Sequence, residues 1–502
     1  MDAGFGARWL ADIRREHYIG GSWAHDARAE PVEIINPANG LLVTTVPRAS
    51  VRDASNAVDA ARHAFDEGPW PRLQPIDRAR MISQLAEGLW RKRELLTEAM
   101  IAQGGCTRAQ ANGAQVLEPI EFMRGYARLA ELDPIESTHV SSDRFGGAPG
   151  LGVGHSIVAR EPVGVVAAIT AFNYPFMLNV HKVGAALAAG CTVVLKPTEF
   201  TCLDAAIMAK VVEEETDIPP GVLNVLLGAG GDVGAHLSSA QGVDHVTFTG
   251  STETGRRVMA GSAATLKRVT LELGGKSANV ITEDADLDRA LGADGGLVTR
   301  HAGQGCAALS RVLVHESIHD AVVQRMVHHA PSIRVGDPSD PTTMMGPLIN
   351  AAQCARVMGY IESGVAEGAT LAFGGSRPPG LPRGHFLSPT VFTDVRSDMR
   401  IAREEIFGPV VVVQTFSSDE QAVRLANDSE FGLVGAVWSG TLERGLSIAS
   451  RIRAGTLNVN GPGTGLFGLP YGGYKQSGIG REKGLAGVRD LSEIKTINYT
   501  AY

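Results

Sequence analysis

Cysteine, excess charge of one sign and long apolar runs are all scarce in this chain of 502 residues. Five cysteines exclude a disulfide framework, and their odd number leaves at least one thiol free, as is typical of a reducing compartment. Lys plus Arg number 46 and Asp plus Glu number 54, so a net charge of −8 offers nucleic acid no basic field. The longest apolar run, Val183 to Leu195, has thirteen residues, whereas a membrane-spanning helix needs about 20.

The first 21 residues mix Asp, Arg and Glu with apolar residues and contain no signal-peptide hydrophobic stretch. We therefore expect a cytoplasmic protein that binds neither membranes nor nucleic acid, and we predict no metal site. Hydrophobic residues make up 44% of the chain, which is enough for a sizeable core. The length is roughly three times a domain of about 150 residues, so two or three domains are expected.

Residues 161–273 alternate between strand-like and helix-like segments. Helix-compatible stretches such as 203–214 and 252–262 separate five short β-branched or apolar runs. Buried strands that alternate with helices predict a parallel sheet with right-handed crossovers, and ligands bind at the strand ends of such sheets. The five predicted strands are Val163–Ile169, Thr192–Leu195, Val222–Leu226, Val246–Thr249 and Val269–Leu273.

A second strand–helix alternation follows, with apolar strands predicted at Val312–Val314 and Val410–Val413. The segment 133–160 is rich in Ser, Gly and Pro and is interpreted as a loop plus an exposed hairpin. We predict an α/β fold with two doubly wound parallel-sheet domains and a small β oligomerisation element. The predicted division is a cofactor-binding domain at 1–132 and 161–273, a catalytic domain at 274–475, and an oligomerisation hairpin and tail at 133–160 and 476–502.

Two segments carry groups suited to covalent catalysis. Cys306 lies in a glycine-bracketed loop, which suits an accessible thiol, although a cysteine taken alone is more often a buried structural residue. Glu272 stands between two leucines at the end of a predicted strand, where burial would raise its pKa towards that of a general base. A salt-bridged structural glutamate is an equally plausible interpretation of that carboxylate.

Two further segments resemble ligand-binding loops. The stretch FTGSTETG (248–255) follows a strand and opens a helix, where free backbone N–H groups and the helix dipole favour phosphate. It lacks the G-x-G-x-x-G spacing, and an ordinary helix cap would look similar. The stretch KPTE (196–199) comes directly after a strand, and alone it would be interpreted as a solvated loop with one ion pair.

Together these segments resemble the aldehyde dehydrogenase superfamily. The resemblance extends from about Tyr18 to the C-terminus and keeps the family's motif order. Because the chain has a glutamate at 272, it resembles the branch that hydrolyses its thioester with water rather than the CoA-acylating branch. The matching stretches are FNYPF (172–176), KPTE (196–199), FTGSTETG (248–255), LELGGKS (271–277), GQGCAALSR (303–311), EEIFGPV (404–410) and PYGGYKQSGIGRE (470–482).

The resemblance implies a role for each matching catalytic position. Cys306 would be the nucleophile, and Glu272 would be the base that activates water to hydrolyse the thioester. Asn173 and the backbone N–H of Cys306 would form the oxyanion hole, which is typically worth several kcal/mol. Lys182 and Glu482 correspond to positions implicated in proton movement.

The same resemblance implies that the cofactor is NAD, with NADP less favoured. Glu199 would accept hydrogen bonds from the adenosine ribose, and a 2′-phosphate there would meet its negative charge. Ser251 would contact the pyrophosphate. The implied cofactor-binding residues are Ile169, Phe172, Lys196, Glu199, Gly250, Ser251, Glu405 and Phe407.

The substrate residues implied by the resemblance are apolar and partly aromatic, which predicts a medium-chain or aromatic aldehyde because burying a hydrocarbon tail is favourable. His181 stands where the family often has Trp, and Leu309 where it often has Gly. The alternative is a semialdehyde dehydrogenase in which His181 and Arg300 form a polar, carboxylate-binding pocket. The implied pocket residues are Phe122, Tyr174, Met177, His181, Leu309, Phe467 and Tyr471.

Two other functions compete with oxidation. The chain could be a non-catalytic binding or structural protein on the same fold, or a thiol hydrolase that pairs Cys306 with His301 and needs no cofactor. Exposed strand candidates in 133–160 and 492–502, together with the resemblance, predict a homotetramer or, less favoured, a homodimer.

Overall fold

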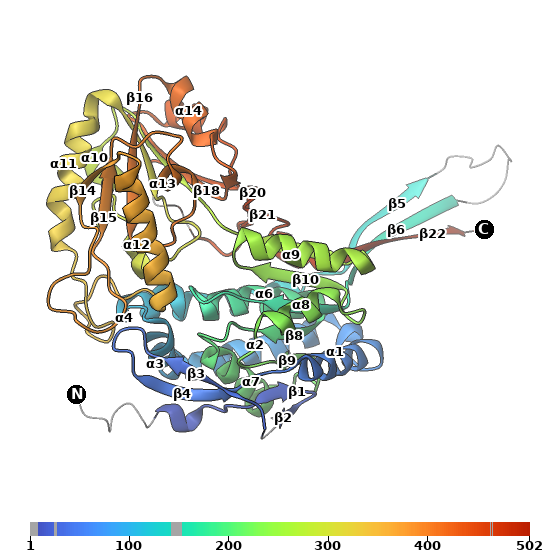
Figure 1. The fold of residues 1–502 in the computed structure, drawn as a ribbon. Coiled ribbons are helices and arrows are strands. Elements are labelled where there is room, and N and C mark those ends of the chain that lie inside the picture. Colours follow the sequence, from blue (N-terminus) through green and yellow to red (C-terminus); the bar gives the residue numbers. More distant parts are fainter. Residues whose placement is uncertain (1–8, 25–27, 142–152, 462, 464, 502) are drawn as a thin grey trace.

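The computed structural model describes residues 9–24, 28–141, 153–461, 463 and 465–501. It consists of two α/β lobes, each built around one sheet, and a slender β element that projects from the lobe formed by the first half of the chain (Figure 1). The α/β fold with two sheets covered by helices is therefore confirmed. Among the described residues, no helix combines the length and apolar character needed to cross a membrane.

The first sheet has eight strands in the order β2-β1-β9-β8-β7-β10-β11-β21. The five strands from β9 to β11 are parallel, whereas β1 and β21 pair antiparallel at the two sides of this group. Strand order reverses between β7 and β10, which is the switch point where such sheets bind ligands. The bounds are β1 His17–Ile19, β2 Ser22–Ala24, β7 Val165–Ile169, β8 Thr192–Lys196, β9 Leu223–Val225, β10 His245–Thr249, β11 Arg268–Glu272 and β21 Gly478–Ile479.

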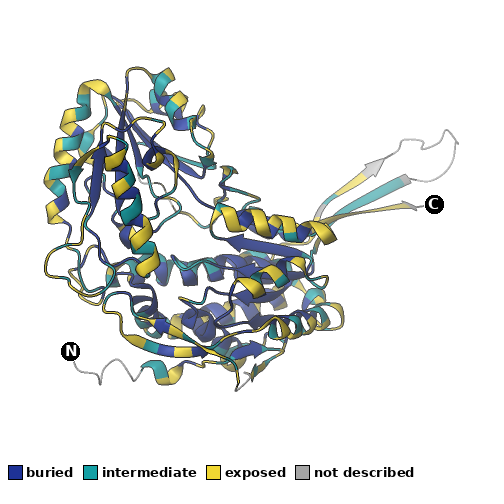
Figure 2. Ribbon diagram, viewed as in Figure 1, coloured by how far each residue is buried: buried dark blue, intermediate teal, exposed yellow. Residues whose placement is uncertain are grey.

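Helices cover both faces of this sheet, which explains its uninterrupted apolar strands. On β7, Val166 and Ala168 face one apolar cluster, while Val165 and Ala167 face another. The first cluster includes α2 Pro75–Arg91, α3 Arg93–Gly104, α5 Leu117–Ala130, α6 Pro175–Ala189 and α7 Leu203–Glu215; the second includes α1 Val51–Asp66, α8 Gly231–Ser239 and α9 Thr252–Ser262. Figure 2 shows the strands as buried and the outer helix faces as exposed.

The second sheet has the order β14-β15-β16-β13-β12-β18-β19, and only β14 is antiparallel to its neighbour. The strands are β12 Ala278–Ile281, β13 Arg311–His315, β14 Thr370–Phe373, β15 Thr390–Thr393, β16 Val410–Phe416, β18 Val434–Trp438 and β19 Thr456–Val459. The helices of this lobe are α10 Leu287–Leu291, α11 His319–His329, α12 Ala351–Ala366, α13 Arg400–Arg403, α14 Asp419–Asn427 and α15 Leu442–Ala449.

The projecting element is a three-stranded antiparallel sheet in the order β22-β6-β5. Its strands are β5 Ile135–Ser141, β6 Val153–Pro162 and β22 Ser492–Ala501. The part of the chain that precedes β22 stays with the first sheet, because β21 extends it and α16 Gly484–Asp490 contacts α5 and α6. Smaller elements are α4 Arg108–Gln110, the π-helical turn η3 Ala111–Gln115, and the strand pairs β3 Pro31–Ile35 with β4 Leu42–Pro47 and β17 Phe431–Gly432 with β20 Tyr474–Lys475.

The carboxyl ends of the first sheet's strands meet the amino ends of the second sheet's strands. The chain crosses directly from Glu272, the last residue of β11, to β12. The loop that precedes β16 contacts this crossing, because Gly275 N–H donates to Glu405 Oε1 over 2.9 Å. The loop that precedes β13 also lies against it, since a Cβ on Gly275 would be 2.5 Å from Cys306 O. Residues from both lobes therefore converge between the two sheets.

Candidate active site

The loop that carries Cys306 is held by close backbone contacts. His301, Ala302 and Gly303 all have left-handed backbone conformations, with φ of 48°, 51° and 72°. A Cβ on Gly303 would lie 2.0 Å from Gly408 O, and a Cβ on Gly275 would lie 2.5 Å from Cys306 O. Only glycine permits these approaches, so the sequence fixes the Cys306 loop against both the crossing segment and the loop before β16.

Cys306 is half-buried, and its sulfur lies 3.6 Å from the Tyr471 hydroxyl. Burial raises the pKa of Cys306 to about 12, against the opposing hydrogen bond from Tyr471. The thiol is therefore protonated at neutral pH in this state, and its nucleophilicity depends on a base or on a change in its surroundings.

Asn173 supports the placement of an oxyanion hole beside this thiol. Its side-chain amide donates to Gln304 O over 3.0 Å, and its own carbonyl oxygen accepts from Gln115 Nε2 over 2.9 Å. Gln304 is fixed in turn, because its Oε1 accepts from Ile349 N over 2.9 Å. The Asn173 amide is thereby held against the backbone of Gln304, which is two residues before Cys306 in the chain, with one N–H left for a substrate oxygen.

Glu272 is buried, with 4% of its surface exposed, and neither carboxylate oxygen has a hydrogen-bond partner among the described residues. Burial, followed by the nearby Glu482 carboxylate, raises the pKa of Glu272 well above its usual value. An unsatisfied buried carboxylate is costly, and the described residues do not place Glu272 in the structural ion pair that the sequence also allowed.

Lys182 and Glu482 form a buried ion pair. The Lys182 ammonium donates to Glu482 Oε1 and, over 3.0 Å, to Thr247 Oγ1. Burial opposes ionisation of Glu482, but the charge of Lys182 lowers the pKa of Glu482 to about 2. The backbones of Glu482 and Tyr471 pair over 2.7 and 2.8 Å, so this ion pair is tied to the residue that contacts the Cys306 thiol.

The predicted cofactor-binding residues of the first sheet lie at its carboxyl edge. Ile169 ends β7 and pairs with Lys196 at the end of β8, while Ser251 caps α9 after β10. The Gly250 N–H donates to Glu272 O over 3.1 Å. Burial lowers the pKa of Lys196, and the neighbouring Glu199 carboxylate opposes that effect. These groups surround the switch point between β7 and β10.

The predicted nicotinamide-binding residues come from the second lobe. Burial raises the pKa of Glu405 to about 7, against the hydrogen bond from Gly275. Phe407 has a left-handed φ of 60°, and its ring meets that of Phe172 edge to face at 5.8 Å. Phe407 and Phe172 therefore bring the two lobes together beside Glu405.

Side chains of the predicted substrate pocket form a chain of contacts that leads away from the thiol. Glu482 Oε2 lies 3.8 Å from His181 Nδ1, and the His181 ring stacks on Phe122 at 5.5 Å. Phe467 contacts Phe122 at 5.6 Å. Met177 contacts the apolar core of the first lobe, and Leu309 is half-buried in the loop before β13.

The structure does not place Arg300 and His301 where the alternative functions would need them. The Arg300 side chain is 83% exposed and lies 3.9 Å from Asp294. His301 is buried beside the Tyr174 ring, both of its nitrogens lack hydrogen-bond partners, and burial lowers its pKa to about 4. No hydrogen bond therefore links His301 to Cys306, which disfavours the thiol-hydrolase alternative.

Sequence reasoning missed two residues at this site. Gln115 lies in the π-helical turn η3, an irregularity that often accompanies functional positions, but no motif identified it. Lys483 directly follows the last matching motif, and its ammonium lies 5.1 Å from the centre of the Phe122 ring. Among the described residues, no group of three His, Cys, Asp or Glu side chains is placed to hold a metal ion.

Comparison with known proteins agrees with this geometry. The model of the aldehyde dehydrogenase family matches residues 23–497. The betaine aldehyde dehydrogenase of Bacillus subtilis (strain 168) is 40% identical over 482 residues, 96% of each chain, and that of Brucella melitensis biotype 2 is 39% identical over 494 residues, 97% of each chain. The chain therefore belongs to the aldehyde dehydrogenase family.

Solved structures are equally similar. A crystal structure of betaine aldehyde dehydrogenase from Staphylococcus aureus in complex with NAD+ has 36% sequence identity and a TM-score of 0.93, and the match covers 99% of this chain and 97% of that one. Another structure of that enzyme with NAD+ has a TM-score of 0.92 and covers 98% and 95%. The similarity thus includes both lobes and the projecting element.

Proposed function

We propose that this protein oxidises a polar aldehyde to a carboxylic acid with NAD, using Cys306 as nucleophile and Glu272 as general base. The observation that carries the proposal is the buried Glu272 carboxylate, which has no hydrogen-bond partner among the described residues and lies on the sheet edge that faces the Cys306 loop. The structural relatives in complex with NAD+ support the choice of cofactor.

The residues present fit a dinucleotide. Ser251 at the start of α9 offers an anion-binding helix terminus, and Lys196 and Glu199 follow the neighbouring strand β8. The absence of a side chain on Gly274 leaves room for Glu405 Oε2, which a Cβ would approach to 2.5 Å. Glu405 Oε1 is bound by Gly275 N–H, so its second oxygen is available to accept from a ribose hydroxyl. Bound NAD would supply the hydride acceptor.

The chain's own groups account for the other steps. The Cys306 thiolate adds to the aldehyde carbon, and the new oxyanion accepts hydrogen bonds from the Asn173 amide and the Cys306 backbone N–H. Loss of hydride from that carbon leaves a thioester. Glu272 then removes a proton from water as the water oxygen attacks the thioester, the C–S bond breaks, and the acid leaves with the thiolate regenerated.

The Lys182–Glu482 ion pair would provide the route by which the proton leaves Glu272. Among the charged groups near Glu272, the Glu482 carboxylate has the largest effect on its pKa and raises it, and the Lys182 ammonium has the next largest and lowers it. Because Lys182 also bonds Thr247, the pair is fixed rather than mobile. We propose that the pair exchanges the proton that Glu272 takes from water, so that the base is reset after each cycle.

The relatives' names favour a polar substrate over the hydrocarbon or aromatic aldehyde expected from the sequence. The structure supports that revision, because the predicted apolar pocket also contains the His181 imidazole and the Lys483 ammonium close to Phe122. The aromatic rings of the pocket therefore do not form a purely hydrocarbon surface.

The lobes suggest a division of labour within this reaction. We propose that the first lobe, with the predicted bounds 1–132 and 161–273, holds NAD, and that 274–475 supplies the nucleophile. The hairpin 133–160 and the tail 476–502 would mediate oligomerisation, although Glu482 and β21 of that tail also serve the first lobe.

The test is an aldehyde panel with the absorbance of reduced nicotinamide as readout. We expect turnover that requires both NAD and Cys306, with Cys306→Ala inactive and Cys354→Ala, a half-buried cysteine on α12, active. NAD should exceed NADP in kcat/KM because of Glu199. Ester hydrolysis at full rate without NAD, and no oxidation of any aldehyde, would instead favour a hydrolase.

A further inference from the structure

Lys483 has a backbone conformation that non-glycine residues rarely adopt. Its φ is 67° and its ψ is 155°, a region that is essentially reserved for glycine. The only other lysine with a positive φ among the described residues is Lys475, whose ammonium donates to Asn427 O and Ser429 O, each over 2.9 Å. Those two bonds explain the conformation of Lys475.

No comparable structural bonds explain Lys483. Among the described residues, its ammonium makes one long hydrogen bond, 3.4 Å to Gly465 O, and lies over the Phe122 ring at 5.1 Å. Burial lowers the pKa of Lys483, and Glu118 is the carboxylate that opposes this effect. Glu118 and Lys483 form no ion pair within 4 Å in the described part of the chain. A strained residue with an underused charge is the pattern expected of a ligand-binding group.

A series of contacts links Lys483 to the thiol. From Cys306 the contacts pass through Tyr471 to Glu482, whose chain neighbour is Lys483. A second series of contacts runs from Glu482 through the His181 imidazole and the Phe122 ring to the Lys483 ammonium. Lys483 is therefore linked to the residues around the thiol both through its chain neighbour Glu482 and through two side chains of the predicted substrate pocket.

Resting on the proposed function, we propose that Lys483 binds a carboxylate at the far end of the substrate, so that the substrate class is a short semialdehyde. A carboxylate would complete the ammonium's hydrogen bonds, and charge-assisted bonds of this kind are the strong ones. His181 adds a second polar group, since it is 6% exposed and its Nε2 has no hydrogen-bond partner in the part of the chain that the structure describes.

A cationic aldehyde fits this pocket poorly. A substrate ammonium would seek the face of an aromatic ring, but the Phe122 face already carries Lys483. A substrate ammonium beside the Phe122 ring would repel the Lys483 ammonium, and this repulsion would select against a cationic aldehyde. The structure thus assigns the anion-binding role to Lys483 rather than to Arg300, whose side chain is largely exposed and lies near Asp294.

The experiment compares succinic semialdehyde, butanal and betaine aldehyde with the full-length enzyme and NAD. In the parent, succinic semialdehyde should have the highest kcat/KM. Lys483→Met should reduce kcat/KM for succinic semialdehyde by roughly 10- to 100-fold, mainly through KM, and change that for butanal by less than about threefold. Lys483→Arg should restore much of the loss, and Lys92→Met, a lysine remote from the site, should have no effect.

Lys483→Gly separates specificity from structure. Glycine adopts the observed backbone angles without strain, so this variant should keep or raise the melting temperature while it loses preference for succinic semialdehyde. An equal loss for all three aldehydes, or a parent that prefers betaine aldehyde or butanal, would overturn the assignment of Lys483. A parent that oxidises none of the panel but hydrolyses esters would instead overturn the proposed function itself.

Discussion

Cys306 and Glu272 both occupy surroundings that favour their neutral forms. Burial raises the pKa of the Cys306 thiol to about 12 and that of the Glu272 carboxyl well above its ordinary value. In the proposed reaction both groups act in the deprotonated form, so their burial opposes the state that this reaction would use. The same desolvation makes each group a stronger base or nucleophile once it has lost its proton.

Glu272→Gln tests the division of labour between these residues. The variant should still form the thioester but hydrolyse it about 10²- to 10⁴-fold more slowly, because the amide cannot accept the water proton. Intact mass after addition of aldehyde and NAD should show an acyl-enzyme that is absent from Cys306→Ala. Turnover at the parent rate would mean that another residue is the base.

The Tyr471 hydroxyl should influence how readily Cys306 ionises. Its hydrogen bond to the sulfur lowers the pKa of Cys306 against the effect of burial, so Tyr471→Phe should raise that pKa further. Alkylation by iodoacetamide should accelerate with rising pH in the parent, because only the thiolate reacts, and should be slower in Tyr471→Phe by up to about tenfold.

Mapping the alkylated peptide distinguishes Cys306 from the half-buried Cys354, whose rate serves as the internal control. An alkylation rate at Cys306 that is independent of pH between 7 and about 10 would contradict the raised pKa of that thiol. Equal alkylation rates in the parent and in Tyr471→Phe would show that Tyr471 does not influence the ionisation of Cys306.

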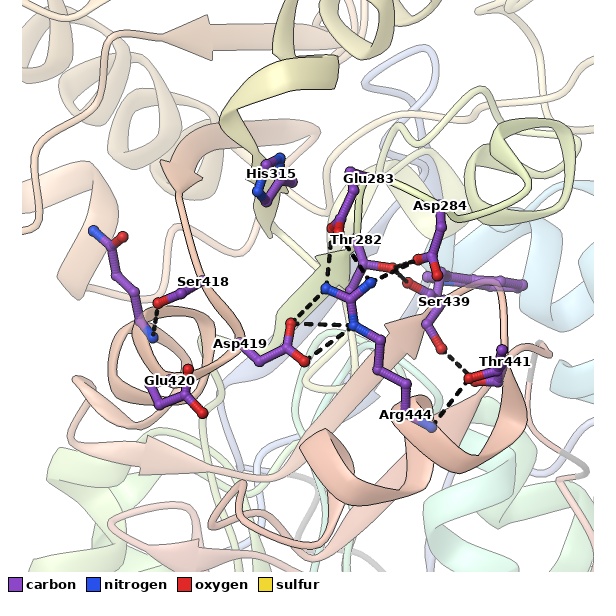
Figure 3. Close-up of polar contacts among 12 residues, drawn as sticks. Thr282, Glu283, Asp284, His315, Ser418, Asp419, Glu420, Ser439, Thr441 and Arg444 are labelled. Carbon is purple, nitrogen blue, oxygen red and sulfur yellow. Dashed lines mark hydrogen bonds and ion pairs between the residues drawn. The ribbon is translucent and has the colours of Figure 1, made fainter.

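At the scale of elements, one arginine joins three segments of the second lobe. Arg444 on α15 bonds Asp419 at the start of α14 and Glu283 and Asp284 just after β12 (Figure 3). Ser418 and Thr441 cap the two helices beside this cluster. The four charged groups are only partly exposed, so the network is worth more than an ordinary surface pair.

Arg444→Ala should therefore destabilise the protein by about 2 kcal/mol, because three carboxylates would be left facing one another. Calorimetry should show a melting temperature several degrees lower than that of the parent. The control is Arg451→Ala, which removes an exposed pair at 3.7 Å with Glu420 and should change stability by less than about 0.5 kcal/mol.

The stability lost in Arg444→Ala should depend on pH with a definite sign. The hydrogen bond from Arg444 lowers the pKa of Glu283, so the stabilisation is present above the ordinary glutamate pKa and is lost as pH falls through the lowered value. The gap in melting temperature between parent and Arg444→Ala should narrow below about pH 4. A gap that stays constant down to pH 3 would show that the carboxylates do not contribute.

The elements that could be predicted from sequence are those whose pattern is local. The helix expected at 252–262 is α9, and the strands expected at 163–169 and 192–195 correspond to β7 and β8, although β7 begins two residues later than expected. These elements could be predicted because apolar runs and helix caps act over a few residues. The antiparallel pairing of β1 and β21 with the parallel strands could not be predicted, since it depends on which distant segments meet at the sheet edges.

The same limit applies to the site. Motif spacing pointed to Glu272 and Cys306, but the contact of Cys306 with Tyr471 joins residues 165 positions apart. Lys483 was missed because its significance lies in its backbone angles and in the Phe122 ring beneath it, neither of which leaves a local sequence signal. The alternative polar pocket pairs His181 with Arg300, but the Arg300 side chain is 83% exposed.

At the scale of the whole molecule, the projecting sheet lacks a core of its own. The strand β22 lies at one edge of the element, and Ile494, Ile497 and Tyr499 along it are 59%, 48% and 48% exposed. Because side chains alternate between the faces of a strand, Ile494 lies on one face while Ile497 and Tyr499 lie on the other. Three strands that are exposed on both faces and at both edges are expected to gain stability from a partner.

We therefore predict a homo-oligomer, preferably a tetramer, built through this element. Light scattering at micromolar concentration should give a mass of at least twice the 52.9 kDa of one chain. Ile494→Glu combined with Ile497→Glu should shift the protein to smaller species, because charges on both faces would have to be desolvated in any interface. Leu266→Glu, at a site that is 91% exposed outside the element, is the matched control and should leave the mass unchanged. A monomeric parent would contradict the prediction, and a double variant of unchanged mass would place the contact elsewhere on the surface.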